Sequence, residues 1–103
     1  MDNQHRKISG YRELTEEEIA LMNKIKEKGA ELLRLHQELQ ETIGRTRYQL
    51  EHMVRTCPTA DSVEALEAFK AAEPERWASI GRTDIQTGVM ALVRSVARPQ
   101  DGA

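Results

Sequence analysis

Cysteine, proline and aromatic residues are scarce in this sequence of 103 residues. It contains 1 cysteine and 3 prolines, and aromatic residues make up 4% of it. A single cysteine, Cys57, excludes an internal disulfide framework and a metal cluster made of cysteines alone, and it suits a reducing compartment. The small share of aromatic residues indicates a thin core. Because a thin core stabilises a short chain only weakly, we expect the protein to form oligomers.

The sequence also lacks long apolar runs and a strong excess of charge. No stretch approaches the roughly 20 apolar residues of a membrane span, and the N-terminal residues, MDNQHRK, lack the apolar stretch of a signal peptide. The net charge of −2 argues against nucleic acid as a general partner. We therefore expect a cytoplasmic protein with neither DNA nor a membrane among its partners.

Recognisable catalytic and cofactor motifs are missing as well. His5, His36 and His52 share no metal-ligand spacing, and the glycines are too isolated to form a phosphate loop. Cys57, beside Pro58, shows no sign of activation. We therefore expect no metal, no cofactor and no enzymatic activity.

One long helix is predicted from residue 15 to about residue 56. Thr15 can cap its start and Glu18, three residues later, can complete a capping box. Gly44 costs about 1 kcal/mol relative to alanine in a helix, so an alternative is that the helix breaks at Gly44. We favour one continuous helix because an apolar stripe continues past this residue. The stripe consists of Met22, Ile25, Gly29, Leu32, His36, Leu39, Ile43, Thr46, Leu50 and Met53. A hydrogen-bonded histidine at a helix interface is the expected role of His36.

The rest of the chain is expected to fold back on this helix. Pro58 ends the helix, with the turn near 57–62, and Asp61 or Ser62 can cap the next segment. Pro74 either kinks that segment or starts a new helix. The fold class is thus all-α: a long antiparallel helical hairpin over 15–98, with a polar N-terminal segment, 1–14, and a frayed tail, 99–103. Folding at the turn brings Leu39 opposite Trp77, which we expect to fill the gap between the helices.

The last helix carries a second surface. Small residues recur at seven-residue spacing, at Gly81, Gly88 and Ser95, and permit close approach of another helix. One interpretation is a single hairpin with poorly filled holes. We favour the other, in which this surface packs on other copies of the chain.

Basic residues gather at both ends of the sequence. Residues 1–12 contain three basic residues against one acidic residue, and residues 82–98 have the same balance. The hairpin brings these segments together, which favours an anion site, although chance clustering on a solvated surface is an equal alternative. Tyr11, beside Arg12, either stacks on a base or packs on the first helical turn.

Three segments of the sequence resemble a known protein family. Residues 5–15 read HRKISGYRELT, residues 18–26 read EIALMNKIK, and residues 76–99 read RWASIGRTDIQTGVMALVRSVARP. They resemble the phage proteins that act as sponges against CBASS, the bacterial anti-phage defence that signals through cyclic oligonucleotides. Residues 41–73 do not match the compact members of that family and look like an extension of the hairpin.

The resemblance implies a function and a site. It implies a homohexamer in the host bacterial cytoplasm that binds cyclic dinucleotides and cyclic trinucleotides without cleaving them, and so keeps CBASS effectors inactive. The tyrosine and the lysine that contact cyclic dinucleotides in the family correspond to Tyr11 and Lys26, with Lys24 close by. Arg12 can neutralise a phosphate. The resemblance also implies a separate trinucleotide pocket, for which Arg82, Thr83 and Arg94 are candidates by charge.

The sequence leaves three alternative functions open. The first is a sponge for the cyclised ADP-ribose signals of Thoeris defence, which shares the helical hairpin. The second is a coiled-coil adaptor that binds a protein through the long stripe. The third, a DNA-binding helical protein, is disfavoured by the net charge and by the acidic stretch 61–76.

Overall fold

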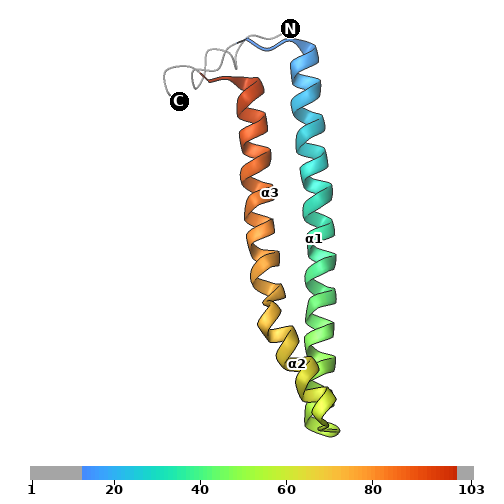
Figure 1. The fold of residues 1–103 in the computed structure, drawn as a ribbon. Coiled ribbons are helices and arrows are strands. Elements are labelled where there is room, and N and C mark those ends of the chain that lie inside the picture. The colour runs from blue at the N-terminus through green and yellow to red at the C-terminus, as the bar shows by residue number, and fades with distance from the viewer. Residues whose placement is uncertain (1–12, 100–103) are drawn as a thin grey trace. The chain divides into compact units, whose positions relative to one another are not determined.

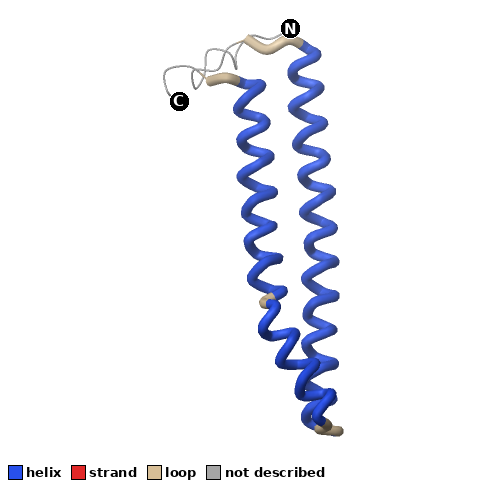
Figure 2. Tube along the Cα trace, in the orientation of Figure 1, coloured by secondary structure: helices blue, strands red, loops and turns tan. Residues whose placement is uncertain are grey.

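The computed structural model describes residues 13–99, and every regular element in that range is an α-helix (Figure 1). The helices are α1 (Glu16–Thr56), α2 (Ala60–Ala72) and α3 (Pro74–Ala97). Short loops separate them (Figure 2). The all-α prediction is confirmed, and α1 continues through Gly44 to the predicted end. The N-terminal site residues Tyr11 and Arg12 and the tail 100–103 lie outside the described residues.

The helices divide into two compact units. Unit 1 joins α1 as far as Leu32 to α3 from Asp84 onward, and unit 2 is Leu33–Thr83. In unit 1, Glu18 binds Arg98 and Gly29 adjoins Val89, so the two segments are antiparallel. In unit 2, His36 binds Ala78 and the Arg47 guanidinium lies over the Phe69 ring. The antiparallel pairing that the sequence predicts is therefore present in each unit.

The start of α1 is held by the predicted capping box. The backbone N–H of Thr15 donates to Glu18 Oε1 at 3.0 Å, and the N–H of Glu18 donates to Thr15 Oγ1 at 3.1 Å. The second carboxylate oxygen of Glu18 accepts a hydrogen bond from Arg98 at 3.0 Å. One glutamate therefore caps α1 and ties it to the residue that follows α3. Arg98 is 62% exposed, so the ion pair itself adds little stability.

The cap of α2 differs from the expectation. Thr59 is the N-cap and accepts from the Ser62 N–H at 3.0 Å, while Ser62 Oγ accepts from the Thr59 N–H at 2.8 Å. The predicted Ser62 thus closes the capping box from its third helical position, and Asp61 lies in the first turn. At the other end, Glu73 adopts a left-handed conformation (φ 50°) that ends α2. Pro74 then starts a new helix, where its fixed φ and missing N–H carry no cost.

The core is thin in both units. Within residues 13–99, the buried hydrophobic side chains are those of Leu66, Ala78 and Ala97, and none of the described side chains is fully buried. The prediction for Trp77 is wrong for the single chain, because its side chain is 59% exposed. Neighbouring helical residues point about 100° apart. Since Ala78 is the residue that faces α1, Trp77 is turned away, and its ring lies against the Arg76 guanidinium.

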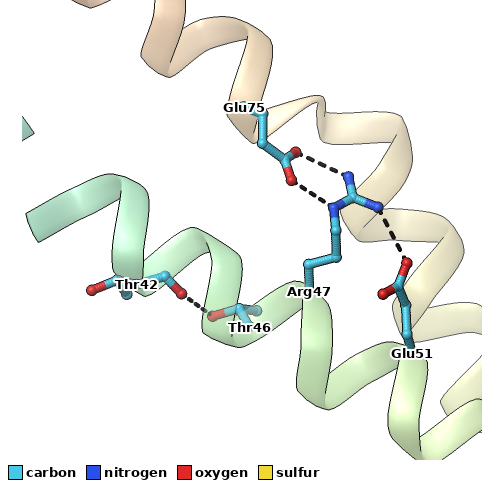
Figure 3. Close-up of polar contacts among 5 residues, drawn as sticks. All are labelled: Thr42, Thr46, Arg47, Glu51 and Glu75. Atoms are coloured by element: carbon cyan, nitrogen blue, oxygen red, sulfur yellow. Dashed lines mark hydrogen bonds and ion pairs between the residues drawn. The ribbon is translucent and has the colours of Figure 1, made fainter. Parts of the chain in front are cut away.

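A polar clamp compensates for the thin core of unit 2. The Arg47 guanidinium makes two hydrogen bonds to the Glu75 carboxylate and lies 3.8 Å from Glu51 (Figure 3). It also lies over the Phe69 ring, 5.1 Å from the ring centroid. It thereby joins all three helices. Such bidentate pairs are stronger and more directional than single ion pairs. The hydrogen bonds lower the pKa of Glu75 and raise that of Arg47.

No helix among the described residues has the length and apolar character that crossing a membrane requires.

The Arg47–Glu75 clamp predicts a pH-dependent stability. A carboxylate with a lowered pKa in the folded state stabilises the fold above its ordinary pKa of 4.5, and this contribution is lost as the pH falls through the folded-state pKa. We expect Glu75→Gln to lower the melting temperature at neutral pH, and the difference from the parent to close in strong acid. Thermal unfolding followed by circular dichroism measures this. Glu64→Gln, at an exposed position on α2, is the control. A difference that persists in acid would show that the clamp is not electrostatic.

Candidate functional site

A groove with two basic residues lies along unit 1. Its volume is about 480 Å³, which is within the range of about 300–1,000 Å³ for small-molecule sites. We call it the Lys26 groove. It is lined by Lys26, Thr87, Val89, Met90, Ala91, Val93, Arg94, Ala97 and Pro99.

The Lys26 groove combines charge with an apolar floor. Lys26 comes from α1, whereas Arg94 lies in the last turn of α3. Met90 and Val93, which also line the groove, are one turn apart on α3, and Met90 is 70% exposed. Cations can bind phosphate groups while an apolar floor packs against a flat ring. The structure therefore brings together two of the residues that the sequence singled out.

A close helix contact sets the width of this groove. Gly29 on α1 is buried, and a Cβ atom added there would lie 2.6 Å from Val89 Cγ2. Only glycine permits this approach. Val89 lines the Lys26 groove and also a second groove on unit 1, beside Lys24, Lys28 and Gly88. A single contact thus determines how far apart the walls of both grooves stand.

A polar groove of about 560 Å³ lies in unit 2. We call it the Arg82 groove. It is lined by Leu33, Arg34, His36, Gln37, Gln40, Ser79, Arg82 and Thr83. His36, only 7% exposed, anchors it through a bond of 2.7 Å between Nε2 and the Ala78 carbonyl, so the predicted interface histidine is confirmed. Thr83 Oγ1 donates to the Ser79 carbonyl at 3.3 Å.

The predicted site residues fall into two groups. Lys26 and Arg94 line the groove of unit 1, while Arg82 and Thr83 line the groove of unit 2. Tyr11 and Arg12 belong to the segment outside the described residues. Sequence reasoning missed Arg34, Gln37 and Gln40, although their spacing of three along one side of α1 is a signal that could have found them.

Residues 13–99 contain no group of three or more histidine, cysteine or acidic side chains that could hold a metal ion. Cys57 is exposed at the end of α1.

Comparison with known proteins identifies a matching family and a similar phage protein. Residues 5–97 match a family model described as the Acb2/Tad1 hairpin domain. Over 106 aligned residues, the chain is 49% identical to Anti-CBASS protein 2 of Pseudomonas phage JBD67, and the alignment spans 97% of this chain and 98% of that protein. The matched range includes the lining residues of both grooves up to Ala97.

The Gly29–Val89 contact predicts that a smaller residue at position 89 compensates for a larger residue at position 29. Gly29→Ala should destabilise the fold by about 1–3 kcal/mol, because the added methyl group overlaps Val89. Val89→Ala in the same chain should remove the overlap and recover part of that loss. Urea unfolding of the parent, both single variants and the double variant measures the coupling. Strictly additive effects would show that the two residues do not set the helix spacing.

Proposed function

The chain belongs to the Acb2/Tad1 hairpin family, and we propose that it is an anti-CBASS protein that sequesters cyclic dinucleotides and cyclic trinucleotides. In this proposal it acts in the cytoplasm of the host bacterium, where it binds the signals of the defence and leaves them chemically intact. The effector that these signals activate then stays inactive. The proposal is supported by the 49% identity to a phage anti-CBASS protein and by the chemistry of the grooves.

The observation that carries the proposal is that Lys26 and Arg94 line one groove together with apolar residues. A cyclic dinucleotide presents two phosphates and two flat bases. Arginine can bind a phosphate with two parallel hydrogen bonds, and lysine acts as a compact charge. Met90 and Val93 offer the apolar surface that a base face needs. Tyr11, from the N-terminal segment 1–14, is proposed to stack on a base, and Arg12 to neutralise a phosphate.

The Arg82 groove supports a second ligand class. Arg34 and Arg82 supply two positive charges, and the amides of Gln37 and Gln40 can each donate and accept hydrogen bonds at base edges. A cyclic trinucleotide offers three phosphates and three bases to such a surface. We propose that this groove, with Arg82 and Thr83, contributes to the trinucleotide site.

Exposed apolar residues support assembly into a homohexamer. In unit 2, Leu35, Leu39 and Trp77 are 57%, 48% and 59% exposed. Gly81, one turn from Trp77, has open space around its Cα. Large apolar side chains exposed to this degree on a single chain indicate surface that another protein covers. A homo-oligomer buries it with copies of the same chain and allows a pocket to be shared between protomers.

A second candidate is a sponge for the cyclised ADP-ribose signals of Thoeris defence. The family description names Tad1 together with Acb2. The pyrophosphate of such a signal carries two negative charges and would fit the same pair of cations. Direct comparison of the two ligand classes by titration separates the candidates.

The binding site predicts specific losses of affinity. Tyr11→Ala should weaken binding of 3′,3′-linked cyclic GMP–AMP by about 1–3 kcal/mol through lost stacking, and Lys26→Ala should weaken it through a lost phosphate contact. Isothermal titration calorimetry measures both. Lys28→Ala, which removes a lysine of the same helix that pairs with Glu31, is the matched control. Parent-like affinity in both test variants would place the site elsewhere on the chain.

Sequestration also predicts that the ligand survives. After incubation with 3′,3′-linked cyclic GMP–AMP and heat denaturation of the protein, the supernatant should contain the intact ligand, and it should reactivate the effector. Mass spectrometry identifies the product, and a sample with a metal chelator should give the same result. Linear dinucleotide or mononucleotides in the supernatant would instead identify a phosphodiesterase.

A further inference from the structure

Arg98 has an unusual backbone conformation at the end of α3. Its φ is 45°, in the left-handed region where glycine is the usual residue after a helix. Pro99 follows it, and a proline favours an extended conformation in the residue before it. A strained conformation of this kind persists only where surrounding contacts hold it. An arginine at this position is therefore explained by what its side chain contacts, since the helix end alone would favour glycine.

Arg98 joins the two segments of unit 1. Its guanidinium donates to Glu18 Oε2 at 3.0 Å, and its backbone N–H donates to the Arg94 carbonyl at 2.8 Å. Glu18 is itself fixed, because its other carboxylate oxygen accepts from the Thr15 N–H in the cap of α1. An ion pair as exposed as this one adds little to the stability of the fold. Its effect is to fix the point at which the chain leaves α3.

The residues on either side of Arg98 belong to the Lys26 groove. Ala97, only 4% exposed, and Pro99, which is half-buried, both line it, and so does Arg94 one turn earlier. Arg98 does not itself line the groove. Because Ala97 and Pro99 are its covalent neighbours, the contact that holds Arg98 also determines where this wall of the groove stands.

We propose that Glu18 and Arg98 are positioning residues whose ion pair holds Ala97 and Pro99 in place, as one wall of the Lys26 groove, before a ligand binds. The inference rests on the proposed function, which assigns an anionic ligand to this groove. A wall that is already in place strengthens binding, because the ligand does not have to order it. The alternative is that Arg98 binds a phosphate directly. The two roles differ in the part of Glu18, which supports binding in the first and competes with the ligand in the second.

Two substitutions that change the charge in opposite directions separate these roles. Glu18→Gln keeps the capping box, which glutamine also forms, but removes the charge that holds Arg98. Arg98→Gly removes the guanidinium and suits the left-handed backbone. We expect each variant to bind 3′,3′-linked cyclic GMP–AMP about tenfold more weakly, because the wall is then in place in only a fraction of the molecules. Calorimetry measures the affinity. Glu17→Gln, an exposed glutamate of the same helical turn, is the control and should bind as the parent does.

The binding results decide between positioning and a general effect of charge. Tighter binding by Glu18→Gln overturns the proposal, because a released Arg98 or the lost negative charge would then favour the anion. Parent affinity in both variants overturns it too. The double variant should bind no more weakly than the weaker single variant, since both changes break the same contact, and additive losses contradict this. Arg98→Gly should melt at or above the parent temperature, so that its weaker binding does not come from a loss of folding.

A measurement without ligand separates this inference from the proposed function. In the ligand-free protein, the order parameter of the Ala97 methyl group, measured by NMR relaxation, should fall in Glu18→Gln and stay at the parent value in Glu17→Gln. An unchanged Ala97 in Glu18→Gln overturns the inference, whatever the protein binds. If Ala97 responds as expected but the parent binds no cyclic dinucleotide, the proposed function fails and the positioning of the groove wall by Glu18 and Arg98 stands.

Discussion

Paired helices cannot cover all of their own apolar residues, and the rest of this structure depends on that constraint. Each unit buries only a few small or medium side chains, and none of those described is fully buried. Burial alone therefore contributes little free energy. The capping box of Thr15 and Glu18, the box of Thr59 and Ser62, and the Arg47 clamp compensate with directional contacts. The apolar surface that remains is available for other copies of the chain and for ligands.

The same constraint explains how so small a chain can offer a binding site. At Gly29, α1 approaches Val89 so closely that side chains to either side of the contact enclose grooves. One of these carries Lys26 and Arg94, and the other is largely apolar and contains Gly88 and Leu92. Val89 lines both. In the proposed function, the groove with Lys26 and Arg94 holds the anionic ligand.

Local features of the sequence predicted the fold well. The cap at Thr15 and the breaks at Pro58 and Pro74 act within a few residues, so they can be recognised without knowledge of the partner helix. The apolar stripe was less informative. A strict alternation of three and four drifts by about 20° per heptad on a straight helix, and Leu39 and Met53, which belong to that stripe, are half exposed while His36 is buried. The Arg47–Glu75 pair joins residues 28 positions apart, and no sequence pattern announces it. For the site, the family resemblance singled out Lys26, and charge singled out Arg82 and Arg94, but their division between two grooves required the structure.

Competition among ligands tests the central claim most directly. The protein is dialysed against an equimolar mixture of cyclic dinucleotides, a cyclic trinucleotide and cyclised ADP-ribose, and the molecules that it retains are released by heating and identified by mass spectrometry. The account predicts enrichment of cyclic dinucleotides and the cyclic trinucleotide over cyclised ADP-ribose. Retention of cyclised ADP-ribose alone would assign the protein to Thoeris signals, and retention of none of these molecules would contradict the account.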